Sequence, residues 1–314
     1  MNVSDLQVKP QDKTNDQPDG VNPGSQNNRK YNRLLSYLNM MISRQTVRTH
    51  SRLKTSIKAS LLGGIVLLAG CETTSQFRPD PQAGVVTRTA LAAEYIRSGD
   101  LDAAQRNLAQ ALKTDPNSVD ANNMMGVLLQ QEGSPSNMAK AESYFKRAIS
   151  IDPNYAQARN NYGVYLSGRK RYQEAIAQFS VAGAALGYEG RAAALENLGR
   201  TYVQVNDPVN AEKTFKQALQ ANRDSAIAKL ELADLFLQKN QVREASGLYN
   251  DYLRSIGSQK QGARALWLGI RIARAERDTI RMKNFINQLG ADYPSSTEYQ
   301  RYLKLQQTPE AVWN

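Results

Sequence analysis

The chain has 314 residues, of which 40 are Lys or Arg and 29 are Asp or Glu, giving a formal net charge of +11 at pH 7. Residues 1–70 contribute +6 of this charge, and residues 71–314 carry an ordinary +5 with no clustered basic face, which argues against nucleic-acid binding. The only cysteine is Cys71 and the only histidine is His50. Beyond Cys71, this inventory excludes disulfides, thiol or histidine catalysis and Cys/His zinc sites.

Residues 1–40 are polar and rich in Asn, Gln, Asp, Lys, Pro and Gly. They carry too few large apolar side chains to offset the conformational entropy lost on folding, so we expect them to be disordered. A secretory signal, described next, is unusual at this distance from the start of a chain. We therefore interpret Met41 as the true start of the protein, with residues 1–40 outside it.

Residues 41–70 have the pattern of a secretory signal peptide. A basic region without acidic residues, containing Arg44 to Lys58, precedes an apolar run from Ala59 to Leu68. About 12 apolar or small residues rising 1.5 Å each fall well short of the roughly 30 Å of a bilayer core. The run is therefore too short for a stable transmembrane helix.

The segment Leu67-Leu68-Ala69-Gly70-Cys71 lies where the apolar run ends. It resembles the lipobox of bacterial lipoproteins, which implies that Cys71 is diacylated, becomes the mature N-terminus and is then acylated on its amine, palmitate being one such chain. The alternative, a buried and inert cysteine, fits poorly because Cys71 precedes any foldable segment. Two or more acyl chains would anchor the protein durably. Glu72 follows in place of the aspartate that resembles an inner-membrane retention signal, which favours the periplasmic face of the outer membrane.

Residues 71–84 contain Pro79, Pro81 and Gly84 and little apolar periodicity, which predicts an extended tether. Residues 85–307 are predicted to form the folded domain, and residues 308–314 a short tail.

From Val85 onward, similar residues recur every 34 to 37 positions. In the first helix of each unit the recurring residue is small: Ala92, Gly126, Gly163, Gly199, Ala233 and Gly269. In the second helix it is Ala104, Ala141, Ala175, Ala211, Ala245 and Met282. Four positions further on a large apolar residue follows: Leu108, Phe145, Phe179, Phe215, Tyr249 and Ile286. The spacing predicts six units, each made of two closely packed helices.

This pattern resembles the tetratricopeptide repeat, a helix-turn-helix unit of about 34 residues. The resemblance implies an all-α, right-handed superhelical solenoid of about six repeats, in which each unit covers the apolar face of its neighbour. A last helix from Thr297 to Gln307 is expected to cap the array. The second unit carries a three-residue insertion around Ser134-Pro135-Ser136.

No catalytic constellation, metal site or phosphate-binding loop emerges from the repeats. The glycines between Gly183 and Gly190 follow no strand and precede no Lys-Ser/Thr, so they predict a longer linker between repeats. Asp100, Asp115 and Asp207 occupy turn or helix-cap positions and are interpreted as turn residues. We expect a non-enzymatic protein with no cofactor other than a covalent lipid on Cys71, and with no small-molecule substrate.

Tetratricopeptide arrays bind extended peptides along the surface formed by successive first helices, and the resemblance transfers this groove to twelve positions. They are Val86, Thr89, Ala93, Ile96, Arg97, Asn123, Val127, Gln130, Gln131, Asn160, Val164 and Ser167. The side-chain amides of Asn123 and Asn160 could pair with a peptide backbone. The alternative is that the Asn and Gln side chains are simply solvated surface.

The lipobox, tether, six units and cap together resemble the type IV pilus pilotin family, also known as PilF or PilW. Runs that carry the likeness are Cys71-Glu72-Thr73-Thr74, residues 122–129 and residues 160–166. The resemblance implies a lipoprotein that binds secretin subunits and promotes their outer-membrane localisation and multimerisation for pilus biogenesis. The alternatives are a lipid-anchored adaptor of outer-membrane protein assembly or envelope maintenance and, more distantly, a glycan-processing enzyme.

Overall fold

The computed structural model describes residues 80–307, which form thirteen α-helices with no strand in that range. The prediction of an all-α fold is therefore confirmed for this part of the chain. None of its helices has the length and apolarity needed to span a bilayer. The predictions for residues 1–40, the signal peptide, Cys71 and the tail at 308–314 lie outside the described residues.

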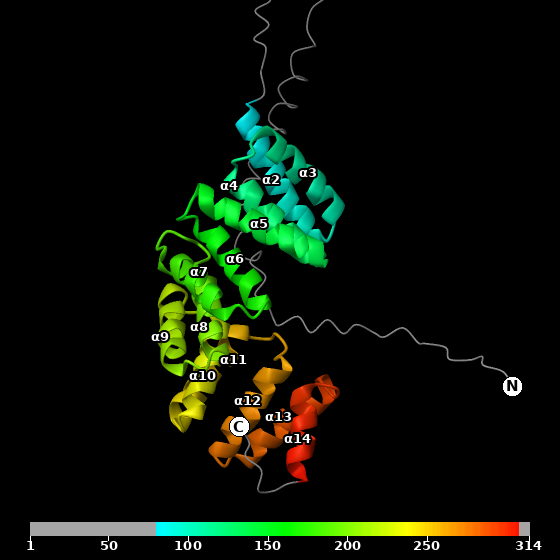
Figure 1. The fold of residues 1–314 in the computed structure, drawn as a ribbon. Helices are drawn as coiled ribbons and strands as arrows, with labels where there is room; N and C mark the ends of the chain where they lie inside the picture. Colours follow the sequence, from blue (N-terminus) through cyan, green and yellow to red (C-terminus); the bar gives the residue numbers. More distant parts are fainter. Residues whose placement is uncertain (1–79, 308–314) are drawn as a thin grey trace, which may run out of the picture. The chain divides into compact units, whose positions relative to one another are not determined.

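The helices form six consecutive pairs followed by a single helix, as Figure 1 shows in chain order. We call the first helix of each pair A and the second B, and number the pairs as repeats 1 to 6. The pairs are α2 (Pro81–Ser98) with α3 (Leu101–Thr114), α4 (Val119–Glu132) with α5 (Pro135–Ile151), α6 (Ala156–Gly168) with α7 (Tyr172–Ala184), α8 (Arg191–Gln204) with α9 (Pro208–Ala221), α10 (Ala226–Gln238) with α11 (Val242–Ile256), and α12 (Ala263–Ala275) with α13 (Thr279–Asp292). The single helix α14 (Thr297–Gln306) confirms the predicted capping helix.

Short polar side chains cap several of the helices. The carboxylates of Asp100 and Asp207 each accept a hydrogen bond from the backbone N–H three residues on, at 3.0 Å, and so cap α3 and α9. Asp115 accepts one from the backbone N–H two residues on, at 2.9 Å, in the turn after α3. These bonds satisfy donors that the first turn of a helix leaves unpaired or that a turn exposes. The interpretation of these aspartates as turn residues is confirmed.

Proline occupies the first helical position of α2 and of α5. Helix α2 begins at Pro81, with Asp80 as its cap, so the prediction that the tether continues through Gly84 is wrong for residues 81–84. In repeat 2, Ser134 caps α5 and Pro135 opens it. The inserted residues therefore lengthen α5 to 17 residues.

Within repeats 2, 3 and 4, a glycine of helix A lies directly against an aromatic ring of helix B. A Cβ atom added to Gly163 would stand 2.6 Å from Cε1 of Phe179, and one added to Gly126 would stand 2.7 Å from the Phe145 ring. No carbon pair tolerates such a distance, so only glycine allows this approach of the two helices. The predicted small–large contacts are confirmed here.

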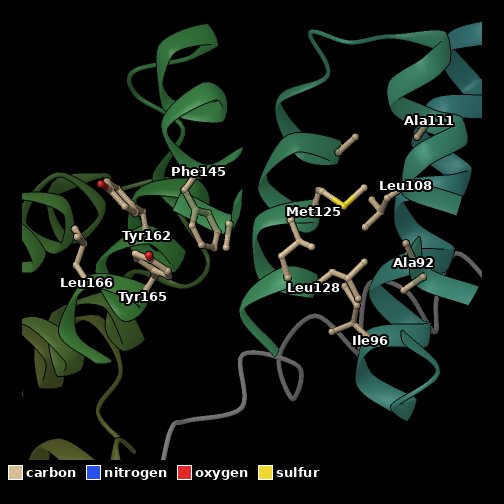
Figure 2. Close-up of a cluster of buried hydrophobic side chains, with 14 of the residues drawn as sticks. Ala92, Ile96, Leu108, Ala111, Met125, Leu128, Phe145, Tyr162, Tyr165 and Leu166 are labelled. Carbon is tan, nitrogen blue, oxygen red and sulfur yellow. The ribbon is translucent and has the colours of Figure 1, made fainter. Parts of the chain in front are cut away.

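In repeats 1 to 3 the core is continuous from one repeat to the next. Figure 2 shows Phe145 of α5 beside Tyr162 and Tyr165 of α6, and the ring centroid of Phe145 lies 5.9 Å from each of the two tyrosine rings. Leu108 of repeat 1 and Leu166 of repeat 3 are fully buried in the same cluster. Each repeat thus covers an apolar face that its neighbour would otherwise expose.

Repeat 6 follows the same rule, but in a register that differs by one residue from the predicted one. Phe285, and not Ile286, is the large side chain opposite Gly269, where an added Cβ would lie 2.9 Å from the Phe285 ring. Arg281 takes the position of the recurring alanine that was assigned to Met282. Its guanidinium lies 5.6 Å from the centroid of the Phe285 ring, a contact that a cation can make favourably.

A polar contact also joins repeats 2 and 3. The carboxylate of Glu142 on α5 accepts hydrogen bonds from Tyr162 at 2.8 Å and from Arg171 at 2.9 Å, and pairs with Lys146 at 2.9 Å. Tyr165 lies 3.4 Å from its second oxygen. Partial burial alone would raise the pKa of Glu142, but the hydrogen bonds from Lys146, Arg171 and Tyr162 outweigh burial and lower it to about 2.

Adding one methyl group at the repeat 3 contact should destabilise the protein. We expect Gly163→Ala to lower the free energy of unfolding by about 1–3 kcal/mol, because the new Cβ overpacks against Phe179. Gly168→Ala is the matched control, since a Cβ there meets nothing within 4 Å. Urea unfolding followed by circular dichroism measures both variants, and equal stability of the two would contradict the proposed contact.

The Glu142 cluster should make stability depend on acid. Its folded-state pKa lies below that of the unfolded chain, so its contribution is complete above pH ~4.5 and is lost as the pH falls towards 2. We expect Glu142→Gln to lower the free energy of unfolding by on the order of 2 kcal/mol at pH 7, and by less than that at pH 3. Glu174→Gln is the control. The Glu174 side chain is 54% exposed, so this change should have little effect on the free energy of unfolding. If the loss of stability in Glu142→Gln were the same at pH 7 and pH 3, the lowered pKa of Glu142 would be refuted.

Candidate partner-binding surface

The predicted groove positions belong to α2, α4 and α6, the A helices of the first three repeats. The structure leaves eight of these side chains exposed or partly exposed: Val86, Ala93, Arg97, Val127, Gln130, Gln131, Val164 and Ser167. Val86 and Val164 are large apolar side chains that are 66% and 41% exposed. These apolar groups, together with the amides of Gln130 and Gln131, can bind an extended peptide through both its side chains and its backbone. The Gln131 amide also donates a hydrogen bond to the carbonyl of Ile96 at 3.4 Å.

Four other predicted groove residues are buried, and the prediction that they face a partner is wrong. Ile96 is a core residue of repeat 1, as Figure 2 shows. The hydroxyl of Thr89 donates a hydrogen bond to the carbonyl of Val85, one turn earlier in α2, at 2.9 Å. Asn123 and Asn160 are 0% and 4% exposed. Their positions face the next A helix rather than solvent.

The two buried asparagines belong to an amide ladder, which we define as the side chains of Asn123, Asn160, Asn161 and Asn197. Asn161 donates a hydrogen bond to Oδ1 of Asn123 at 3.1 Å, and Asn197 donates one to Oδ1 of Asn160 at 3.2 Å. These bonds join α4 to α6 and α6 to α8. Because a buried amide is costly without partners, the ladder favours one alignment of adjacent repeats.

In repeat 4 a carboxylate replaces the amide at the same repeat position. Glu196 is 6% exposed and accepts a hydrogen bond from the hydroxyl of Ser225 at 2.6 Å. Burial raises the pKa of this carboxyl group, an effect that the Ser225 hydrogen bond and the Arg200 charge only partly oppose. The polar link between repeats therefore changes from amides to ionisable groups at α8.

Repeats 4 to 6 are joined by a charge ladder, which we define as Arg200, Glu231, Asp234, Arg264 and Arg271. Glu231 accepts two hydrogen bonds from Arg264, both at 2.6 Å, and lies 3.1 Å from Arg200. Asp234 accepts one from Arg271 at 2.7 Å. These pairs link α8 to α10 and α10 to α12.

Glu231 stays charged in spite of its burial. Its side chain is 5% exposed, and desolvation alone would raise its pKa. The hydrogen bonds and charges of Arg264 and Arg200 outweigh that effect and hold the pKa below its usual value. Removing either arginine would leave a buried carboxylate without sufficient compensation.

Sequence reasoning missed the charge ladder. Its signal is a carboxylate in one A helix and an arginine in an adjacent A helix 31 to 37 residues away, as for Arg200 and Glu231 or Asp234 and Arg271. Among residues 80–307, no group of three or more His, Cys, Asp or Glu side chains is arranged to hold a metal ion. The surface offers apolar, amide and paired ionic groups, whose chemistry suits binding of a polypeptide.

Comparisons with known proteins agree with this architecture. Models of the tetratricopeptide repeat match residues 89–156, 144–177 and 202–266. A solved structure of PilF from Pseudomonas aeruginosa is similar, with a TM-score of 0.66, 30% identity and coverage of 71% of this chain and 98% of that one. A structure of PilW, a widely conserved type IV pilus biogenesis factor, has a TM-score of 0.60, 30% identity and coverage of 70% and 98%.

The sequence comparison extends over most of a characterised relative. The chain is 33% identical over 208 residues to the type IV pilus assembly protein PilF of Pseudomonas aeruginosa, covering 66% of this chain and 80% of that protein. The structural likeness to PilF and PilW spans nearly the whole of both solved chains. The chain therefore belongs to the PilF and PilW family of tetratricopeptide-repeat proteins of type IV pilus biogenesis.

Proposed function

We propose that the protein is a pilotin, a non-enzymatic lipoprotein that binds secretin subunits and promotes their localisation and multimerisation in the outer membrane for type IV pilus biogenesis. The observation that carries this proposal is the 33% identity over 208 residues to the type IV pilus assembly protein PilF. The specific client, a secretin, comes from the resemblance of the whole chain to the pilotin family.

The exposed face of the first three A helices supports a role in binding an extended client. Val86, Val127 and Val164 supply apolar contacts, and Gln130 and Gln131 supply donors and acceptors for a peptide backbone. A secretin subunit that has not yet assembled exposes strand edges and apolar surface, which are prone to aggregation. Covering part of that surface would keep the subunit competent for assembly.

The second part of the proposal is a covalent lipid on Cys71, which would hold the protein at the periplasmic face of the outer membrane. Asp80, the cap of α2, follows Cys71 by nine positions, a distance of at most about 30 Å at full extension. The first repeat would therefore stay close to the bilayer. Tethering the client-binding repeats in this way raises the effective concentration of the client at the membrane without any new contact.

Replacing Cys71 should separate the two parts of this function. We expect Cys71→Ser to leave the thermal unfolding of the repeats unchanged, because Cys71 precedes the described fold. The variant should leave the outer-membrane fraction, and secretin multimers there should fall several-fold. Membrane fractionation with immunoblotting of unboiled samples measures both quantities, with Ser75→Ala as a control that preserves the cysteine.

Two outcomes would overturn parts of the proposal. Normal secretin multimers in the outer membrane of the Cys71→Ser strain would show that anchoring is not required. Recovery of outer-membrane assembly proteins and no secretin with the tagged wild-type protein would leave the fold unchanged but replace the proposed client.

A further inference from the structure

A pocket of about 620 Å³ opens between α10, α12 and α14, away from the first three repeats. Its lining includes Leu230 and Asp234 from α10, Trp267 and Arg271 from α12, and Glu298 and Arg301 from α14. The volume is in the range typical of ligand sites. Leu230 and Asp234 occupy the same positions of their A helix as Asn160 and Val164 do in α6, so the pocket uses positions equivalent to those of the predicted groove.

Most of the charges at this pocket are already paired. Asp234 accepts a hydrogen bond from Arg271 at 2.7 Å, and Arg264, a further lining residue, is held by both oxygens of Glu231. The Arg271 side chain is only 10% exposed. These groups form a wall of fixed polarity, and a ligand would not have to neutralise them.

Arg301 is different. Its guanidinium lies 5.5 Å from the ring centroid of Trp267, and its side chain is exposed. None of the ion pairs formed within residues 80–307 includes Arg301. An arginine held over an aromatic ring keeps its planar donor edge available for a carboxylate, which it can bind through two parallel hydrogen bonds.

The apolar part of the wall lies next to this charge. The Trp267 side chain is almost completely buried, yet it lines the pocket together with Leu230 and Leu268. A ligand that places a carboxylate on Arg301 can therefore place an adjacent apolar group against these three residues. Burying that group would strengthen the ionic contact by excluding water from it.

We propose that this pocket is a second binding site, which takes an extended acidic peptide segment with an Asp or Glu side chain beside a large apolar residue. The carboxylate binds Arg301, and the apolar side chain packs against Trp267, Leu230 and Leu268. The three lining arginines are balanced in number by Asp234, Glu298 and the nearby Glu231, so the wall has no large excess of positive charge. That balance favours a single carboxylate over a densely anionic lipid surface. The site does not depend on the identity of the client bound by repeats 1 to 3.

Tryptophan fluorescence reports on this pocket directly. The chain has two tryptophans, so Trp313→Phe in the full chain leaves Trp267 as the only tryptophan, which is excited selectively at wavelengths where tyrosine does not absorb. The probe is the blocked hexapeptide acetyl-Ala-Phe-Asp-Leu-Glu-Ala-amide, and its reference is the same peptide with Asn and Gln in place of Asp and Glu. We expect the acidic peptide to change Trp267 emission saturably and to bind at least tenfold more tightly than the amide peptide.

Charge reversal at Arg301 tests the assignment against general electrostatics. Arg301→Glu should lower the affinity for the acidic peptide at least tenfold. Lys283→Glu makes the same charge change on the exposed face of α13, and its affinity for the peptide should stay within twofold of that of the parent chain. Arg301→Gln, which removes the charge without reversing it, serves if circular dichroism shows that Arg301→Glu has lost helix. Arg301→Gln should also lower the affinity for the acidic peptide several-fold.

Three results would overturn the proposal. Equal losses of peptide affinity in Arg301→Glu and Lys283→Glu would show that binding depends only on the net charge of the protein. Equal affinity for the acidic and amide peptides would show that the carboxylates do not contribute to binding. Binding to phosphatidylglycerol vesicles that Arg301→Glu abolishes, without any peptide binding, would assign the pocket to a lipid headgroup instead.

Discussion

The contact between a helix-A glycine and a helix-B aromatic ring is the constraint on which the rest of the structure depends. Gly126, Gly163 and Gly199 allow Phe145, Phe179 and Phe215 to lie where any Cβ would collide with them. The two helices of a repeat can then pack closely enough to leave a single apolar face for the neighbouring repeat. Because each repeat pairs an A helix with a B helix in the same order, the A helices present comparable positions from one unit to the next. The candidate binding surfaces are built on these positions.

Polar side chains between the A helices decide which of these positions a partner can reach. In repeats 2 to 4 the amide ladder uses two of them to join neighbouring repeats, and in repeats 4 to 6 the charge ladder does the same. The exposed valines and glutamines lie on repeats 1 to 3. The Arg301 pocket is lined in part by Asp234, Arg264 and Arg271 of the charge ladder itself. The hydrogen bonds and ion pairs of these ladders form only when adjacent A helices are aligned as observed, so they favour one arrangement of neighbouring repeats.

Periodicity predicted the six units, and the resemblance to the tetratricopeptide repeat supplied their two-helix form and the capping helix. This prediction succeeded because steric fit at Gly163 or Phe179 depends on neighbours within one unit. It failed where the partner lies a repeat away: nothing local in the sequence indicates that Asn123 is buried by Asn161. The register of repeat 6 was missed because Arg281 stands where an alanine was expected. Pro81 was assigned to the tether because prolines and Gly84 without apolar periodicity are typical of a linker. Proline is also favoured at the first position of a helix, and that is where Pro81 lies.

The measurement that tests the central claim most directly is capture of client proteins from a solubilised membrane extract by the tagged, full-length protein, with mass spectrometry of the bound fraction. The account predicts that a secretin is recovered, that Val86→Asp combined with Val164→Asp removes most of it, and that Ile280→Asp does not. Ile280 is the matched control, because it is 76% exposed but lies on α13, outside the first three A helices. Undiminished capture by the valine variant, or capture without any secretin, would contradict the account.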